Sequence, residues 1–221
     1  MKICVGIISY LPEDDSKREV RLNRLQSLLN QLNTHFNLPI LIIAQNWKDF
    51  KVNGNITVFT YDRLGITKAR MILREHFLNS VYDYMIMLDD DMELSDDQAE
   101  YDAYLNFIEK TKREYYFVKN FLNNFSCISK QAFKKLTYDP NINAENGTGY
   151  EDWIFHEKCK KYLDSVEIST NLPKYERSHF LRDEYSTWGA TQDVNIIKRN
   201  EVASRKIVKQ IRGTVGSVPW F

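Results

Sequence analysis

The sequence has no excess of either charge, few cysteines and no long hydrophobic run. Thirty Lys and Arg residues balance thirty Asp and Glu residues, so the whole chain has no net charge that would steer it toward nucleic acid. The three cysteines (Cys4, Cys127 and Cys159) are odd in number and widely spaced, which argues against a disulfide framework or a zinc site and favours a reducing compartment. No apolar stretch approaches the ~20 residues that a membrane-spanning helix needs.

The composition is that of a globular protein, with 43% hydrophobic and 27% charged residues. At 221 residues the chain is long enough for one large domain with a sizeable core. Residues 2–8 follow a strand pattern at once, which leaves no room for a signal peptide. We therefore expect a cytoplasmic protein whose only membrane association would be peripheral, at the inner membrane face.

The chain is organised around residues 84–91, where an apolar run ends in three carboxylates. The run from Tyr84 to Leu88 is typical of a strand that is buried on both faces of a parallel sheet. Asp89, Asp90 and Asp91 follow it directly, and adjacent carboxylates repel one another unless a cation lies among them. Mg²⁺ and Mn²⁺ prefer carboxylate oxygen, and open α/β sheets bind ligands beyond the carboxyl ends of their strands. We therefore predict a metal–phosphate site; the alternative is a solvated acidic turn that starts a helix.

Strand and helix patterns alternate on either side of this segment. Strands are predicted at 3–8, 39–44, 56–61 and 84–88, and helices at 20–32 and 67–78. This alternation predicts an α/β fold with a mostly parallel, doubly wound sheet flanked by helices. Later predicted helices are 95–112 (opened by a capping box of Ser95 and Gln98), 130–136, 152–162 and 194–212, and later predicted strands are 115–118, 126–129 and 165–169.

Two further clusters have residue types that suit catalysis or ligand binding. Glu151 and Asp152 start a predicted helix directly after a glycine-containing loop. A carboxylate there can be positioned as a base and the loop can close over a substrate, although an acidic first turn is common on any helix. Lys68 and Arg70 lie near the start of a helix that a glycine precedes, which suits either a diphosphate or a solvated helix end.

Five landmarks occur in order along residues 1–190: a strand that ends in Ser9-Tyr10, a Gly-x-x-x-Ala-Arg helix start at 65–70, an Asp-x-Asp motif at 89–91, a glycine-containing loop that leads into Glu151-Asp152, and a later histidine, His179. In this order the chain resembles family-2 nucleotide-sugar glycosyltransferases of the GT-A fold. The resemblance implies a GT-A-like, Rossmann-type domain with a nucleotide-sugar-binding half at 1–94 and an acceptor-binding half at 95–190. A C-terminal basic amphipathic helix and tail would follow at 191–221.

The resemblance also implies a role for each landmark. Asp91 would bind the metal directly, Asp89 would contact the metal or the ribose, and His179 would be a further metal ligand. Asp152 would be the catalytic base that deprotonates the acceptor hydroxyl, with Glu151 in support. The implied nucleotide- and diphosphate-binding residues are Ser9, Tyr10, Gln45, Arg63, Lys68, Arg70, Asp89 and Asp90.

One position departs from the family pattern. Many relatives have an aspartate after the second strand that reads the nucleobase, whereas this chain has Gln45-Asn46. An amide can still pair with a uracil edge, so UDP remains the expected nucleotide.

The expected function is a metal-dependent, inverting transfer of one sugar from a nucleotide-sugar to an acceptor hydroxyl, with Mn²⁺ or Mg²⁺ as the metal. A divalent cation and basic side chains would stabilise the leaving diphosphate, while a carboxylate takes the acceptor proton. Two alternatives stay open. A sugar-phosphate nucleotidyltransferase is disfavoured because residues 9–16 are acidic and contain no glycine. A non-catalytic nucleotide- or carbohydrate-binding module is the other.

The predicted C-terminal helix is strongly basic. Its cations are Lys198, Arg199, Arg205, Lys206, Lys209 and Arg212, opposed only by Glu201. Val194, Ile197, Ile207, Val208 and Ile211 form an apolar stripe on the same helix. The helix either packs on the domain with a solvated basic face or contacts an anionic surface, which would be lipid headgroups or a nucleic-acid backbone.

Overall fold

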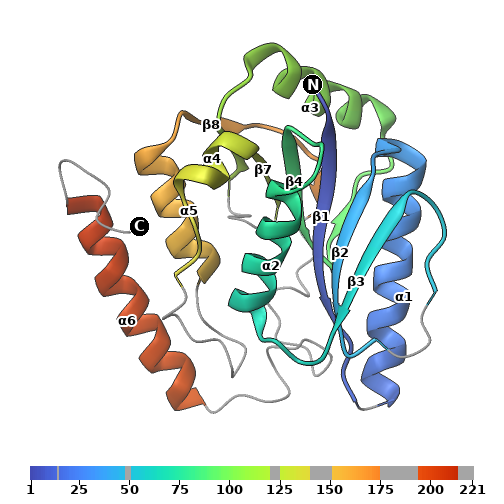
Figure 1. Cartoon of the computed structure of the whole chain (residues 1–221), viewed down its shortest axis with the longest axis horizontal. Coiled ribbons are helices and arrows are strands. Elements are labelled where there is room, and N and C mark those ends of the chain that lie inside the picture. The colour runs from blue at the N-terminus through green and yellow to red at the C-terminus, as the bar shows by residue number, and fades with distance from the viewer. Residues whose placement is uncertain (14, 48–50, 120–124, 140–150, 175–193, 214–221) are drawn as a thin grey trace.

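The computed structural model is built on a seven-stranded sheet with the strand order β3-β2-β1-β4-β7-β6-β8 (Figure 1). The structure describes residues 1–13, 15–47, 51–119, 125–139, 151–174 and 194–213, without the side chains of 16, 194–201 and 203. The fold class predicted from the sequence is confirmed, because this sheet is mostly parallel and has helices on both faces.

The first four strands run parallel: β1 (Ile3–Tyr10), β2 (Ile40–Gln45), β3 (Ile56–Tyr61) and β4 (Tyr84–Asp89). The chain passes from β1 outward to β2 and β3 and then returns to β4 on the other side of β1. Such a switch point opens a crevice at the carboxyl ends of the strands. Register places Ile8 opposite Asp89 and Tyr10 opposite Gln45, so the predicted site residues end their strands at one edge.

The other half of the sheet is mixed. β6 (Tyr115–Val118) and β8 (Ser165–Ile168) pair in parallel, whereas β7 (Phe125–Ser129) is antiparallel to both β4 and β6. A separate pair of two-residue strands, β5 (Glu93–Leu94) and β9 (Pro173–Lys174), was not expected from the sequence. Strands this short carry too little periodicity to be recognised.

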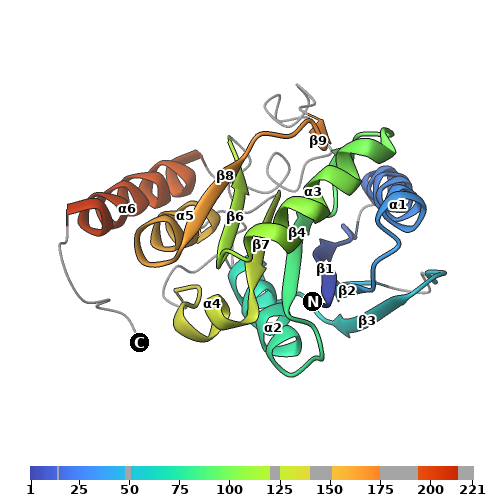
Figure 2. The same cartoon turned by 90° about the horizontal axis from the view of Figure 1, so that it is seen from above.

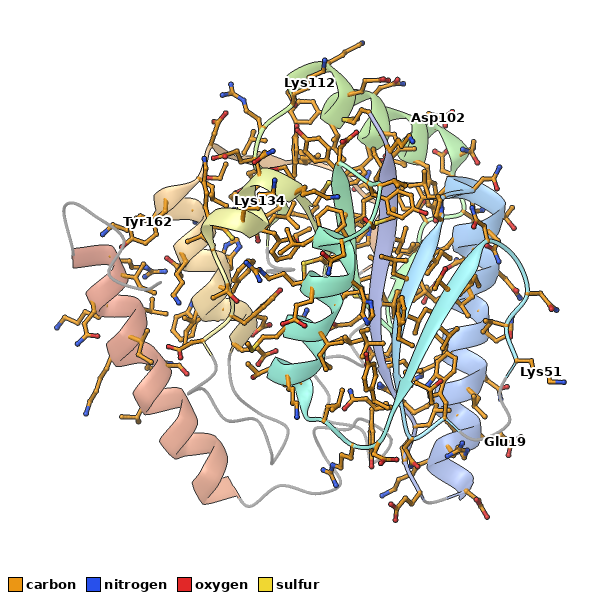
Figure 3. The ribbon with its side chains drawn as sticks, in the orientation of Figure 1. Glu19, Lys51, Asp102, Lys112, Lys134 and Tyr162 are labelled. Atoms are coloured by element: carbon orange, nitrogen blue, oxygen red, sulfur yellow. The ribbon has the colours of Figure 1, made fainter. Side chains whose placement is uncertain are left out.

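Two layers of helices enclose the sheet (Figure 2). The helices are α1 (Asp15–Gln31, continued by a π-helical segment at Leu32–Phe36), α2 (Ile66–Leu78), α3 (Gln98–Thr111), α4 (Lys130–Lys135), α5 (Glu151–Tyr162) and α6 (Val194–Gly213). Apolar side chains of α1 and α3 pack on one face of the sheet, and those of α2, α4 and α5 pack on the other. Side chains fill the layers between them, while Asp102 of α3 and Lys112, the residue that follows this helix, are exposed (Figure 3).

The cap of α3 differs from the prediction. Asp97, and not Ser95, is the N-cap, because its carboxylate accepts a hydrogen bond from the Ala99 N–H at 2.9 Å. The Ser95 hydroxyl instead accepts from the Asp97 N–H at 3.1 Å, and the Gln98 side chain donates to the His35 carbonyl. Ser95 and Asp97 are both good capping residues, and the sequence pattern alone did not separate them.

α6 packs along the outer side of α5. Val208 and Ile211 contact Ile154, and Arg212 forms an ion pair with Glu157 at 2.6 Å. Among the described side chains of α6, the exposed ones include Val202, Arg205, Lys206, Lys209 and Arg212. None of the described helices is both long and apolar enough to cross a bilayer.

Candidate active site at the carboxyl ends of β1, β2 and β4

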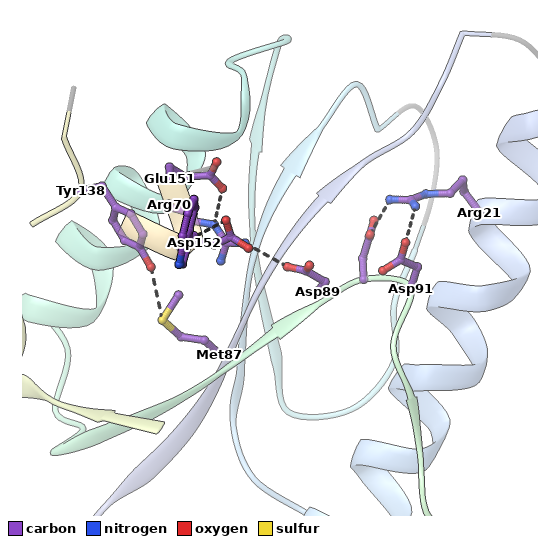
Figure 4. Close-up of polar contacts among 10 residues, drawn as sticks. Arg21, Arg70, Met87, Asp89, Asp91, Tyr138, Glu151 and Asp152 are labelled. Carbon is purple, nitrogen blue, oxygen red and sulfur yellow. Dashed lines mark hydrogen bonds and ion pairs between the residues drawn. The ribbon is translucent and has the colours of Figure 1, made fainter. Parts of the chain in front are cut away.

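The alternation of β4 divides the acidic triplet between the two faces of the sheet. Met85 and Met87 belong to the core under α2, and Ile86 and Leu88 to the core under α1. Since side chains alternate along a strand, Asp89 continues on the α2 face and the next residue points to the α1 face. The ion pairs follow this division, with one arginine on each side (Figure 4).

On the α2 face, Arg70 joins two carboxylates that are far apart in the sequence. Its Nε donates to Glu151 Oε1 at 3.1 Å, and its terminal NH2 donates to Asp89 Oδ1 at 3.2 Å. Arg70 and Glu151 are buried, whereas the Asp89 side chain is 23% exposed. The guanidinium also lies 6.0 Å from the ring centre of Tyr138, which itself stacks on Phe155.

The carboxylates on this face hold protons more tightly than usual. Burial, together with the charge of Asp152, raises the pKa of Glu151 to about 7 against the opposing charge of Arg70. Burial also raises the pKa of Asp89 to about 6, with the neighbouring aspartates adding to the shift and Arg70 opposing it. A carboxylate cluster with pKa values this high is one that a bound cation would stabilise in its charged form.

Asp152 lies at the second residue of α5 and is half-buried. One of its oxygens accepts a hydrogen bond from the Trp153 N–H at 2.7 Å. Its charge acts on both Glu151 and Asp89, so the start of α5 and the end of β4 share one electrostatic environment. A partly exposed carboxylate at this place has the access that a base for an acceptor hydroxyl needs.

On the α1 face, Arg21 holds the other two aspartates. Its two terminal nitrogens donate to Asp90 at 2.5 Å and to Asp91 at 3.0 Å. Asp90 is buried, and it also accepts hydrogen bonds from the Ser9 hydroxyl and the Tyr10 N–H. Asp91 is 21% exposed and uses one oxygen for Arg21.

Asp89 and Asp91 have the chemistry of donors for a hard divalent cation. Each is partly exposed, and each forms an ion pair with an arginine through one oxygen. In the part of the chain that the structure describes, no group of three or more His, Cys, Asp and Glu residues is arranged to hold a metal by itself. Mg²⁺ is commonly bound by one or two carboxylates together with substrate phosphates and water, so two aspartates fit such an ion.

The residues expected to bind the nucleotide lie beside the triplet. The Arg63 guanidinium is 5.4 Å from the ring centre of Tyr10. Gln45 accepts a hydrogen bond from the Leu64 N–H at 2.9 Å and thereby fixes the loop between β3 and α2. Lys68, in the first turn of α2, is exposed. Of these residues, Tyr10 and Arg63 offer a planar and partly accessible surface.

The structure thus brings together Ser9, Tyr10, Gln45, Arg70, Asp89, Asp90, Asp91, Glu151 and Asp152, with Arg63 and Lys68 on the adjoining loop and helix. The prediction for His179 falls outside the described residues. Sequence reasoning missed Arg21, although a signal existed. Arg21 lies in register with the buried Leu25, Leu28 and Leu32, and an arginine within a helix's apolar stripe must have a buried partner.

No protein-family model matches the sequence, and no curated protein matches it. Solved structures do match the fold. Residues 1–349 of S. aureus TarS, in complex with UDP-GlcNAc, superpose with a TM-score of 0.60 and 12% identity, over 96% of this chain and 72% of that one. Glucosyl-3-phosphoglycerate synthase from Mycobacterium tuberculosis, in complex with Mn²⁺, UDP and its product, gives a TM-score of 0.57 and 10% identity, over 98% and 81%.

A third match belongs to a different enzyme class. A structure described as a glucose-1-phosphate thymidylyltransferase from Bacillus anthracis gives a TM-score of 0.53 and 13% identity, over 98% of each chain. At such identities the likeness concerns the fold alone. The chain therefore has the fold of GT-A-type nucleotide-sugar glycosyltransferases, and its activity has to be argued from the site.

Proposed function

We propose that this protein is a metal-dependent, inverting glycosyltransferase that moves one sugar from a nucleotide-sugar to an acceptor hydroxyl. The observation that carries the proposal is the Arg70 bridge. It joins Asp89, at the end of the switch-point strand, to Glu151, which is 81 residues from Arg70 in the sequence. The candidate metal-binding Asp89 and the residue directly before the candidate base Asp152 are therefore held by one guanidinium.

Asp89 and Asp91 would hold the divalent cation, with His179 as the further ligand that the family resemblance implies. Bound there, Mn²⁺ or Mg²⁺ would supply positive charge to the leaving diphosphate. Asp90 is not included among the ligands, because it is buried and paired with Arg21. Its part in binding is indirect, through the placement of Ser9 and Tyr10.

Tyr10 and Arg63 would contact the nucleoside, while Gln45, which is buried and accepts a hydrogen bond from the Leu64 N–H, would hold the adjoining loop. Lys68 would meet the diphosphate from the first turn of α2, where its ammonium adds to the positive end of the helix. UDP is the nucleotide that we propose, because the two glycosyltransferase structures of this fold compared above were determined with UDP or UDP-GlcNAc.

Asp152 would act as the base. It would take the proton from the acceptor hydroxyl as the oxygen attacks the anomeric carbon on the side opposite to the diphosphate. The C–O bond to the sugar forms as the bond to the diphosphate breaks, and attack from the opposite side inverts the anomeric centre. Glu151 would support Asp152 from the buried first residue of α5.

The proposal is tested by nucleotide binding and product analysis. We expect UDP with Mn²⁺ to raise the melting temperature of the wild type and to raise it much less in Asp91→Ala. Incubation with UDP-sugars should release UDP, and EDTA should stop the release. Pyrophosphate formed from a sugar phosphate and a nucleoside triphosphate would instead identify a nucleotidyltransferase, the class of the third structural match. Binding without turnover of any donor would indicate a binding module.

For α6 we propose peripheral contact with an anionic bilayer surface. The support is its exposed Arg205, Lys206 and Lys209 beside the exposed Val202. Each neutralised cation should weaken sedimentation with phosphatidylglycerol vesicles by several-fold, since one basic residue near such a surface contributes ~1 kcal/mol. The test compares Lys206→Gln/Lys209→Gln with wild type. Unchanged sedimentation, or binding to DNA only, would refute the membrane contact.

A further inference from the structure

The Arg70 side chain is buried and bonded to carboxylates of the protein itself. Its side chain is only 2% exposed, its Nε is bonded to Glu151, and one terminal nitrogen is bonded to Asp89. The ring of Tyr138 lies beside the guanidinium. The Nε and one terminal nitrogen of this arginine are therefore directed at the protein's own carboxylates.

Lys68 provides the contrast within the same helix. It is exposed, whereas Arg70, two residues later, is buried. An α-helix turns ~100° per residue, so two residues apart are on nearly opposite sides. The two cations of the Gly-x-x-x-Ala-Arg segment therefore cannot meet the same diphosphate in the same way. Only Lys68 is at the surface.

We propose that Arg70 is a positioning residue that fixes the base Asp152 relative to the metal-binding Asp89, and that it makes no contact with the diphosphate. This inference rests on the proposed glycosyltransferase function. Arg70 holds Glu151, and Glu151 is the first residue of α5, directly before Asp152. The same guanidinium holds Asp89 at the end of β4. The planar guanidinium of Arg70 thus links Asp89 to the start of the helix that carries Asp152.

The rigid fork of the guanidinium is what makes the link. An arginine presents several N–H donors in one plane, whereas a lysine is a single point charge on a flexible stem. Arg70→Lys therefore keeps the positive charge among the carboxylates but loses the planar fork that fixes their relative position. The start of α5 should then shift or loosen, and a misplacement of ~1 Å costs on the order of 100-fold in rate.

The experiment compares Arg70→Lys with Lys68→Met. The dissociation constant of UDP in the presence of Mn²⁺ is measured by calorimetry. Turnover is measured as the release of UDP when water replaces the acceptor and the UDP-sugar is hydrolysed. For Arg70→Lys we expect turnover to fall by about 100-fold while the dissociation constant stays within about threefold of wild type. For Lys68→Met we expect UDP binding to weaken about tenfold, because a charged contact to the diphosphate is lost. Weakening of UDP binding by tenfold or more in Arg70→Lys would overturn the proposal.

Amide hydrogen exchange gives a second readout that needs no nucleotide. In Arg70→Lys the amides at the start of α5 should exchange faster than in wild type, while those of α2 beyond residue 70 should not. Unchanged exchange at the start of α5 would refute a positioning role. If Arg70→Lys does not fold, Glu151→Met, which removes the acceptor of the Arg70 Nε–H, tests the same link and should likewise reduce turnover while leaving UDP binding within about threefold of wild type. Failure of the proposed function would appear separately, as a wild type that binds neither UDP nor GDP with Mn²⁺.

Discussion

The two arginines that hold the acidic triplet lie on opposite faces of the sheet and differ in the state of their carboxylates. On the α1 face the closed pair is Arg21 and Asp90, with side chains 5% and 6% exposed, while Asp91, the other partner of Arg21, is 21% exposed. On the α2 face Arg70 and Glu151 are similarly buried and Asp89 is 23% exposed, so the two faces differ in the protonation of their buried carboxylates and not in exposure. The second partner of Arg70, Glu151, has its pKa raised to about 7 by burial.

This difference separates a structural role from an adaptable one. Asp90 is fixed by Arg21, by the Ser9 hydroxyl and by the Tyr10 N–H, so it anchors the end of β4 to α1 and β1. The carboxylates near Arg70 can exchange a proton near neutral pH, and Asp89 can reach solvent or a cation. Burial also raises the pKa of Asp90, but Arg21 and the hydrogen bonds from Ser9 and Tyr10 oppose that shift. The first region therefore sets the position of the site, and the second is where a proton is exchanged near neutral pH.

The largest expected effect is that of Arg21→Met, which breaks the closed side. Asp90 would keep a buried charge without its counter-ion, and breaking a buried pair by removing one partner costs about 3–5 kcal/mol. The free energy of unfolding, measured by urea denaturation, should fall by that amount. In Arg21→Met/Asp90→Asn no buried charge is left unpaired, because Asp91, the other partner of Arg21, is partly exposed and can be hydrated, so more than half of the loss should be recovered. A double variant as unstable as the single one would contradict this account.

A smaller loss is expected from Arg70→Met on the adaptable side. Glu151 can take up a proton when its counter-ion is removed, and Asp89 can be hydrated, so neither has to remain as a buried charge. We expect a loss of about 1–3 kcal/mol in the same urea experiment. The comparison between the two faces would be wrong if Arg70→Met were at least as destabilising as Arg21→Met.

The pH dependence of stability tests whether Glu151, on the α2 face, exchanges a proton near neutral pH. The folded protein holds a proton on Glu151 more tightly than the unfolded chain does, with a pKa of about 7 against the ordinary value of 4.5. This proton stabilises the folded state fully at pH values below 4.5, the ordinary pKa of a glutamate. The stabilisation is lost as pH rises through about 7, the pKa in the folded protein. Glu151→Gln resembles the protonated form, so wild type should lose a few degrees of melting temperature relative to it between pH 5 and pH 8.

Glu157 supplies the control for that measurement. It lies on the same helix, and its hydrogen bonds to Arg212 hold its pKa below the ordinary value. Its charge therefore does not change between pH 5 and pH 8, and the gap in melting temperature between wild type and Glu157→Gln should stay constant. A gap for Glu151→Gln that is equally constant would show that Glu151 is ionised throughout.

Most of the sheet could be predicted from the sequence, since β3 and β6 have the predicted bounds and the other strands of the main sheet differ by at most two residues at an end. Continuous apolar runs such as that of β4 are typical of strands buried on both faces. The pairing of β7 and the β5–β9 pair could not be predicted, because strand direction and very short strands leave no periodic signal.

Apart from Arg21, the residues that meet at this edge of the sheet were named from the sequence, but their contacts were not. The order of motifs brought Asp89 and Glu151 into the prediction, whereas the bridge between them depends on the tertiary position of Arg70. Arg70 was expected at the diphosphate together with Lys68; helical spacing alone shows that the two point in different directions. Both arginines lie in the apolar stripes of their helices, Arg21 with Leu25 and Arg70 with Leu73 and Phe77, and that pattern can be read without a structure.

The smallest expected effect on stability is that of removing the hydroxyl of Tyr138, the residue whose ring lies beside Arg70. Its hydroxyl donates to the Met87 sulfur at 3.6 Å, and a thioether is a weak acceptor. Tyr138→Phe keeps the ring that lies beside Arg70 and stacks on Phe155, so the free energy of unfolding should change by less than about 0.5 kcal/mol. Tyr138→Leu removes the ring as well and should cost about 1–3 kcal/mol. Equal losses in the two variants would mean that the hydroxyl, and not the ring, supports the guanidinium on this face.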